Sequence, residues 1–205
     1  MKILCEPQGM MGANCYMFSS NETAILIDPS ALTSELSDFL RANREKQLFI
    51  IATHRHCDHI AAIPAIKEQF GGSVCISAED VCGLASMEDS LGSYLGIFHS
   101  AISPDIILKE GDVTLGDITL KVLKTPGHTD GSICIITPDA LFSGDTLFHL
   151  SIGRTDFPSG SLQLMQQSLT KLFALKTDYT VYPGHGETTT LFYEQIHNPY
   201  YIREF

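Results

Sequence analysis

Residues 48–59 read LFIIATHRHCDH, an apolar run that passes directly into three histidines and an aspartate. The apolar half is typical of a buried strand, in which alternate side chains lie on the same side. His54, His56 and Asp58 are therefore expected to face one way. Helical spacing follows at Ile60, Ile63, Ile66 and Phe70. Because Asp58 and His59 lie where this helix begins, they can turn toward a different point, and one short segment can supply ligands to two metal ions.

Three more candidate ligands each follow an apolar, strand-like run and lie in a glycine-containing turn. They are His128 after residues 120–123, Asp145 after residues 140–142 and His185 after residues 180–182. Each turn sequence is ordinary by itself, so the argument rests on their joint presence and order. Imidazoles mixed with carboxylates are the ligands that borderline metals such as zinc prefer. The sequence therefore predicts a two-metal site formed by His54, His56, Asp58, His59, His128, Asp145 and His185.

These motifs, together with residues 12–16 (GANCY), 26–29 (LIDP) and 184–190 (GHGETTT), resemble the metallo-β-lactamase superfamily. Within it the chain is most similar to the small hydrolases related to glyoxalase II (hydroxyacylglutathione hydrolase), and the resemblance covers nearly the whole chain. It implies an α/β fold, a four-layer αββα sandwich with the metal site at the sheet edge. It also implies two divalent metal ions, with zinc favoured and iron or manganese as alternatives.

The resemblance implies a division of the ligands between two ions. One ion is assigned to His54, His56 and His128, the other to Asp58, His59 and His185, and Asp145 is assigned to both. Two ions about 3.5 to 4 Å apart would deprotonate a bridging water, and the resulting hydroxide would attack a carbonyl polarised by one of them. Asp58 is the expected catalytic residue, holding or accepting the proton of that hydroxide. A thioester suits this chemistry because its thiolate leaves without a dedicated general acid.

Substrate recognition has one candidate residue. Arg154 lies in the stretch 151–158 (SIGRTDFP), where glyoxalase II has a lysine and a tyrosine that hold glutathione, and it is similar in position to that lysine. Asp156 occupies the place of the tyrosine. Arg154 is therefore expected either to bind substrate or to form a structural ion pair with Asp156. The expected partner is a small-molecule acyl thioester such as S-D-lactoylglutathione.

Composition agrees with a single enzyme domain over residues 1–205, without a separate C-terminal glutathione-binding helical domain. The chain is 44% hydrophobic, yet no apolar run is long enough to span a bilayer, and residues 1–7 do not resemble a signal peptide. Six cysteines without CxxC pairs fit a reducing cytoplasm. A formal net charge of -11 argues against a nucleic-acid partner, which would require a basic face.

Two surface helices are expected, over Ser34–Glu45 and Leu162–Leu175. The second is expected to bury Leu162, Met165, Leu169, Leu172 and Phe173. Residues 78–105 lie where they can partly cover the site. Their side chains Tyr94, Phe98 and His99 are interpreted as ordinary packing, with the lining of an acyl pocket as the alternative.

Supporting roles are assigned to several other side chains. Partners that fix the ligand imidazoles are expected among Asp28, Thr53, Thr125 and Thr129. Cys57 is interpreted as a packing residue, because it alternates away from His56. His149 and His197 lie outside every motif and are interpreted as structural.

Three alternative functions are kept open. A persulfide dioxygenase would use a mononuclear iron site, here His54, His128 and Asp145. A lactonase or other ester hydrolase would use the same two-metal chemistry on a different carbonyl. A non-enzymatic metal-binding or sensing module would need the ligands for structure only, but structural zinc sites are typically closed by four protein ligands and are often rich in cysteine.

Overall fold

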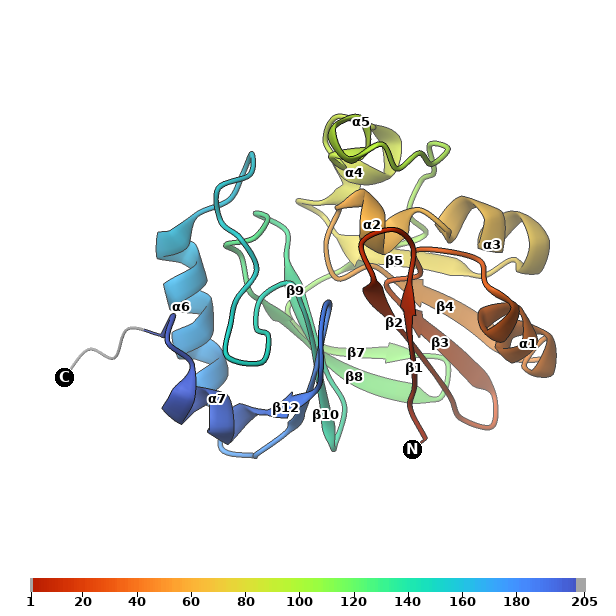
Figure 1. The fold of residues 1–205 in the computed structure, drawn as a ribbon. Coiled ribbons are helices and arrows are strands. Elements are labelled where there is room, and N and C mark those ends of the chain that lie inside the picture. Colours follow the sequence, from red (N-terminus) through yellow and green to blue (C-terminus); the bar gives the residue numbers. More distant parts are fainter. Residues whose placement is uncertain (1, 202–205) are drawn as a thin grey trace.

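Residues 2–201 are described by a computed structural model, in which two six-stranded sheets pack face to face between outer helices (Figure 1). This confirms the predicted four-layer αββα sandwich. Within residues 2–201, no helix is both long and apolar enough to cross a membrane.

The first sheet keeps its strands in chain order. They are β1 (Leu4–Gln8), β2 (Ala13–Ser19), β3 (Thr23–Ile27), β4 (Gln47–Ile51), β5 (Ser73–Ser77) and β6 (Ile106–Leu108). The pairs from β1 to β3 are antiparallel, and those from β3 to β6 are parallel. Each parallel connection includes helices, as crossovers between parallel strands require. These helices are α1 (Ser34–Ala42), α2 (Cys57–Ile60), α3 (Ile63–Phe70), α4 (Val81–Ala85) and α5 (Gly92–Leu95).

The second sheet has the order β12-β11-β10-β9-β8-β7. Its strands are β7 (Gly111–Leu115), β8 (Ile118–Lys124), β9 (Ile133–Ile136), β10 (Ala140–Gly144), β11 (Thr180–Pro183) and β12 (Thr189–Thr190). The single parallel pair is β10 with β11, and it is joined by α6 (Leu162–Phe173). The last helix is α7 (Leu191–His197), which lies beside α6 on the outer face (Figure 1).

Three buried clusters fill the three interfaces between the four layers. Alternation along each strand sends successive side chains to opposite interfaces. On β3, Ile25 and Ile27 face the other sheet, whereas Leu26 packs toward the helices. On β10, Phe142 and Leu141 divide in the same way between the central cluster and the one under α6. Because both faces of each sheet are covered, these strands are continuously apolar in sequence.

Both expected helices are present, and each is shorter than expected. Helix α1 begins at Ser34, where the Thr33 hydroxyl accepts from the backbone N–H of Leu36 at 3.1 Å, and it ends at Ala42 rather than Glu45. Helix α6 begins at Leu162 and buries four of the five expected residues. The expectation for Leu162 was wrong, since it is 54% exposed. The buried stripe begins one turn later, at Met165.

The sheet ends that supply the candidate ligands are tied together by backbone hydrogen bonds. The N–H of Ile133 donates to Thr53 O at 2.9 Å, which joins β9 of the second sheet to the loop after β4 of the first. The N–H of Asn14 donates to Gly184 O at 2.7 Å, and the N–H of Gly184 donates to Gly144 O at 2.8 Å. These bonds bring the loops after β4, β10 and β11 to one edge of the sandwich.

Candidate metal centre

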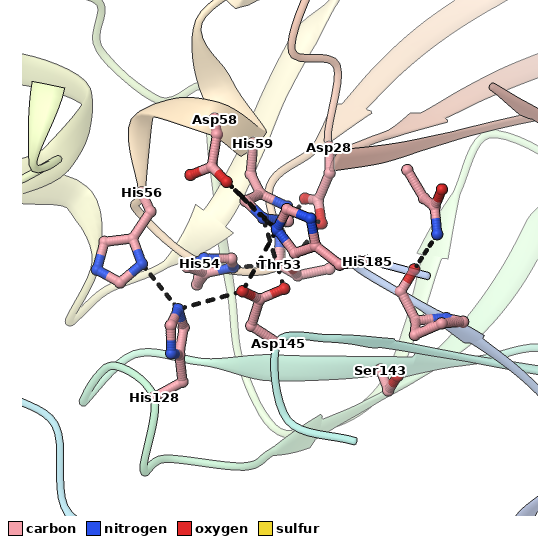
Figure 2. A network of polar contacts seen from close by, with 12 residues as sticks. Asp28, Thr53, His54, His56, Asp58, His59, His128, Ser143, Asp145 and His185 are labelled. Carbon is pink, nitrogen blue, oxygen red and sulfur yellow. Dashed lines mark hydrogen bonds and ion pairs between the residues drawn. The ribbon is translucent and has the colours of Figure 1, made fainter. Parts of the chain in front are cut away.

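All seven expected ligands converge at this edge (Figure 2). They come from both sheets: His54 and His56 from the loop after β4, Asp58 and His59 from α2, His128 from the β8–β9 loop, Asp145 from the end of β10 and His185 from the end of β11. Each is buried, except that the side chain of His185 is 26% exposed. The structure therefore places the expected residues together, although they are spread over more than half of the sequence.

Three histidines form a first group. His54, His56 and His128 each offer one ring nitrogen, and the three nitrogens lie within 4.8 Å of one another. His56 Nδ1 and His128 Nε2 are 2.8 Å apart, and the buried His54 Nε2 has no hydrogen-bond partner. An unpaired buried nitrogen is costly unless something binds it. This group fits a metal ion that accepts imidazole nitrogens.

The second group contains one carboxylate and two histidines. Donor atoms of Asp58, His59 and His185 also lie within 4.8 Å of one another. His59 Nε2 is 3.2 Å from His185 Nε2, and His185 Nε2 is 3.3 Å from Asp58 Oδ2. This mixture of nitrogen and oxygen donors also suits zinc and neighbouring transition metals.

Asp145 lies between the two groups. Its Oδ2 is 3.4 Å from His128 Nε2 and 3.7 Å from His185 Nε2, and its Oδ1 is 3.5 Å from His59 Nε2, so the carboxylate lies near donors of both groups. Oδ1 is buried without a hydrogen-bond partner. Gly184 leaves room for it, because a Cβ at that position would lie 2.1 Å from Oδ1. The geometry allows this carboxylate to serve both groups at once.

Asp28 and Thr53 orient two of the imidazoles. Asp28 accepts from the Thr53 backbone N–H at 2.7 Å, from the Thr53 hydroxyl at 2.6 Å and from His59 Nδ1 at 3.0 Å. The single hydroxyl proton of Thr53 is thereby used, so Thr53 Oγ1 accepts from His54 Nδ1 at 3.1 Å. In their neutral, metal-binding forms both imidazoles therefore carry their proton on Nδ1 and present an unprotonated Nε2 to the site.

A third imidazole is oriented by the backbone. His128 Nδ1 donates to the carbonyl oxygen of Arg154 at 2.7 Å, which also leaves its Nε2 unprotonated. The expected roles of Thr125 and Thr129 are not observed among the described residues. Thr125 Oγ1 lies 3.0 Å from Thr146 Oγ1, and Thr129 Oγ1 donates to Asp80 at 2.7 Å. Neither hydroxyl forms a hydrogen bond with a ligand ring in the described part of the chain, because these partners lie in other segments.

Burial and neighbouring charges set the protonation of the site. Burial lowers the pKa of His56 to about 2, with help from His128, and it also lowers the pKa of His54 far below its usual value. Both rings are therefore neutral, the form that binds metals. Burial opposes the charged form of His59 as well, but Asp145, Asp58 and Asp28 raise its pKa to about 10. In the absence of metal, protonated His59 compensates the surrounding carboxylates.

A cleft of about 280 Å³ opens directly onto both groups. Its polar lining consists of candidate ligands from both groups together with Arg154, and its apolar lining consists of Met11, Leu91, Leu95, Phe148 and Phe157. Arg154 is held at the cleft by Asp156 through two contacts of 2.7 and 2.8 Å, and its guanidinium lies 3.8 Å from the centre of the Phe157 ring. The ion pair anticipated from the sequence is thus present, at a position that also faces the cleft.

The apolar cleft residues were missed from the sequence because no motif contains them. Leu91 and Leu95 belong to the segment expected to cover the site partly, and they do line the cleft. Their aromatic neighbours do not pack as expected, since Tyr94 is 74% and Phe98 is 77% exposed. A periodic pattern identifies a core face, whereas a wall assembled from separate loops has no period to detect.

Other side chains agree with their sequence-based interpretation. Cys57 is fully buried, and burial, together with the charge of Asp58, raises the pKa of its thiol to about 12. His149 stacks on Tyr193, with ring centres 5.5 Å apart, and lies 3.3 Å from the buried carboxylate of Glu194. The ring of His197 also lies against Tyr193, with ring centres 4.5 Å apart.

Comparisons with known proteins show the family of the chain. A family model described as the metallo-beta-lactamase superfamily matches residues 9–185. A probable metallo-hydrolase of Streptococcus pyogenes is 30% identical over 210 residues, covering 98% of this chain and 90% of the relative. The crystal structure of BLEG-1 B3 metallo-beta-lactamase is 31% identical, with a TM-score of 0.89 and coverage of 97% and 99%. That of TTHA1623 in a di-iron-bound form is 29% identical, with a TM-score of 0.85 and coverage of 96% and 99%.

Proposed function

The chain belongs to the metallo-β-lactamase superfamily, and from this premise we propose that it is a binuclear metal-dependent hydrolase that cleaves thioesters. The observation that carries the proposal is the position of Asp145. Its carboxylate lies between the two donor groups, within 3.7 Å of nitrogens from both, and it lines an open cleft, an arrangement that suits a pair of ions accessible to substrate.

The proposed assignment of ligands follows the two groups. His54, His56 and His128 would hold one ion, Asp58, His59 and His185 the other, and Asp145 both. When bound, the ions would polarise the substrate carbonyl and make water nucleophilic near neutral pH. Zinc suits these donors best, and the relative solved in a di-iron-bound form supports iron as the alternative.

The remaining steps depend on side chains of the chain itself. Asp58 lines the cleft, and its carboxylate can accept the proton of the attacking water. Leu91, Leu95 and Phe148 provide apolar walls that can hold an acyl group and limit the access of water. A thiolate leaves without protonation, so the reaction needs no further acid.

Arg154 is the proposed substrate-binding residue. It is exposed at the cleft, and a substrate carboxylate such as those of glutathione would compete with Asp156 for its guanidinium. Exposed ion pairs contribute little to stability, so the exchange would cost little. S-D-lactoylglutathione is therefore the first substrate to test.

The test is thiol release from S-D-lactoylglutathione by metal-loaded protein and by the same preparation stripped with a chelator. Metal-dependent release supports thioester hydrolysis, and its return on adding back metal excludes damage by the chelator. Absence of release from protein with both ions bound would contradict the proposal. Oxygen uptake with a persulfide substrate by iron-loaded protein would indicate the dioxygenase chemistry instead.

Hydrolysis of a cyclic amide or ester is the second candidate. It is favoured by the 31% identity and TM-score of 0.89 to a protein named as a B3 metallo-beta-lactamase. A chromogenic cephalosporin and a simple lactone, assayed with the same preparation, distinguish it from thioester hydrolysis. Turnover of either compound without thiol release would make this the better assignment.

A further inference from the structure

A buried carboxylate outside the candidate ligands lies behind the metal centre. Asp80, between β5 and α4, is completely buried. An ionised carboxylate in this position is costly unless its oxygens are paired. The partners of Asp80 are residues that adjoin the ligands in sequence, and they belong to two different loops.

The first partner is Arg55, the residue between His54 and His56. Asp80 Oδ2 accepts from the Arg55 backbone N–H at 3.0 Å, and Asp80 Oδ1 accepts from its Nη1 at 3.1 Å. One carboxylate thus fixes both the main chain and the side chain at the centre of the first ligand loop. Helix α4 packs closely here, because a Cβ on Gly83 would lie 2.4 Å from the Cβ of Arg55.

The second partner belongs to the loop that contains His128. The hydroxyl of Thr129, the next residue, donates to Asp80 Oδ2 at 2.7 Å. Arg55 Nη1 also donates to Asp130 Oδ1 at 2.7 Å, which joins the two loops a second time. The backbone of Gly131 is packed against the carboxylate, since a Cβ there would lie 2.5 Å from Asp80 Cγ.

The charge of Asp80 also matters for a cation. Arg55 lies between the candidate ligands His54 and His56 in the sequence and carries a permanent positive charge. This charge would repel a divalent ion bound nearby. Asp80 and Asp130 offset that charge through the contacts above. Removal of the Asp80 charge would leave Arg55 only partly compensated in a region where burial weakens screening.

Asp28 is a second buried carboxylate beside the ligand segment. Asp28 follows β3 and binds Thr53 and His59, whereas Asp80 follows β5. The strands β3 and β5 flank β4, which leads into the ligand segment. The fold therefore provides one buried carboxylate on each side of this segment. The residues that Asp80 binds, Arg55 and Thr129, are sequence neighbours of His54, His56 and His128.

We propose that Asp80 is a positioning residue that holds His54, His56 and His128 in their metal-binding arrangement and so sets the affinity of that ion. The inference rests on the proposed two-ion site. Substitution of a residue that supports metal ligands typically lowers metal affinity 10- to 100-fold. Loss of Asp80 should therefore weaken one ion of the pair and leave the other.

The experiment compares metal-free wild-type protein with Asp80→Asn, Thr129→Val and the control Asp105→Asn. Asp105 also binds a cation, Lys67, and a backbone N–H, that of Val74, but it has no contact with the ligand loops. Zinc is titrated in competition with a chromogenic chelator, and the visible spectrum of cobalt reports on each site. Folding of the metal-free variants is checked by circular dichroism.

We expect two ions in wild type and in Asp105→Asn, and a 10- to 100-fold loss of affinity for one ion in Asp80→Asn, with the cobalt spectrum of the other ion unchanged. Thr129→Val should weaken the same ion less, because the Arg55 pair remains. A folded Asp80→Asn protein with wild-type affinity for both ions, or equally weakened at both, would overturn the proposal.

If Asp80→Asn does not fold, the decision rests on Thr129→Val, and wild-type affinity in that variant overturns the proposal. A wild-type stoichiometry of one ion would instead contradict the two-ion site. Asp80 is then judged by whether Asp80→Asn weakens the single ion, and unchanged affinity for that ion overturns its role.

Discussion

The placement of one proton at His54 determines whether this buried ring can bind a metal. The hydroxyl of Thr53 donates to Asp28, so it must accept from His54 Nδ1, and Nε2 is left unprotonated. A hydroxyl is needed here for its single proton and its free lone pairs. The motif THRHCDH therefore contains a residue that prepares a ligand as well as the ligands themselves.

Replacement of Thr53 by valine tests this relay. The variant leaves His54 Nδ1 without an acceptor and Asp28 without a donor, so zinc affinity should fall about 10- to 100-fold. Stability should fall by about 1 to 3 kcal/mol, because buried polar groups lose partners. Thr53→Ser, which keeps the hydroxyl, is the matched control. Equal zinc affinity in both variants, measured by chelator competition, would contradict the assigned proton position.

Asp145→Ala tests the carboxylate shared by the two donor groups. Because both groups lose a donor, metal content and thioester hydrolysis should fall together, each by at least about tenfold. Metal is counted by atomic emission and hydrolysis by thiol release. If hydrolysis is unchanged and both ions are retained, Asp145 does not bridge them.

At the scale of the element, strands and helices were predictable where a period exists. Apolar runs such as residues 48–53 correctly indicated strands buried on both faces, and the stripe at Met165, Leu169 and Leu172 indicated α6. The predictions of helix ends and of the burial of Leu162, in the first turn of α6, were less accurate, because burial there depends on where the neighbouring layer ends.

The convergence of the ligands could be expected from their common position after strands. The contacts of Asp80 and the walls of the cleft join distant loops, and nothing local in the sequence records them.

Helix α6 allows the burial difference to be measured within one element. Leu169 is completely buried, so Leu169→Ala should lower the free energy of unfolding by about 2 to 5 kcal/mol. Leu162→Ala removes the same atoms from a side chain that is 54% exposed, and it should change stability by less than about 1 kcal/mol. Urea unfolding of both variants provides the comparison. Equal losses would mean that Leu162 is buried in solution.

At the scale of the whole molecule, burial divides the cysteines into two classes. Cys5 and Cys82 are exposed. The buried cysteines are Cys15, Cys57, Cys75 and Cys134. Burial, with a contribution from Asp105, raises the pKa of Cys75 to about 12, and burial raises that of Cys134 to about 11, so their reactive thiolate forms are rare near neutral pH.

A thiol-specific chromogenic reagent at pH 8 should therefore react rapidly with two thiols in the folded protein and with all six after denaturation. Burial also raises the pKa of the Cys5 thiol, which lowers its thiolate fraction at this pH. Rapid reaction of four or more thiols would show that the layers open readily.

A Cys57→Ala variant should retain its metal and its activity, because the thiol contributes to packing and not to metal binding.

The chain changes sheets once, between β6 and β7, and this crossover divides the ligands. The first half of the molecule contains His54, His56, Asp58 and His59, and the second half contains His128, Asp145 and His185. Neither half contains a complete donor group, so each proposed ion would bind ligands from both halves and crosslink them. Metal binding would then require the two halves to be packed together. In a chain cut at the crossover, the ions would help to hold the two fragments together.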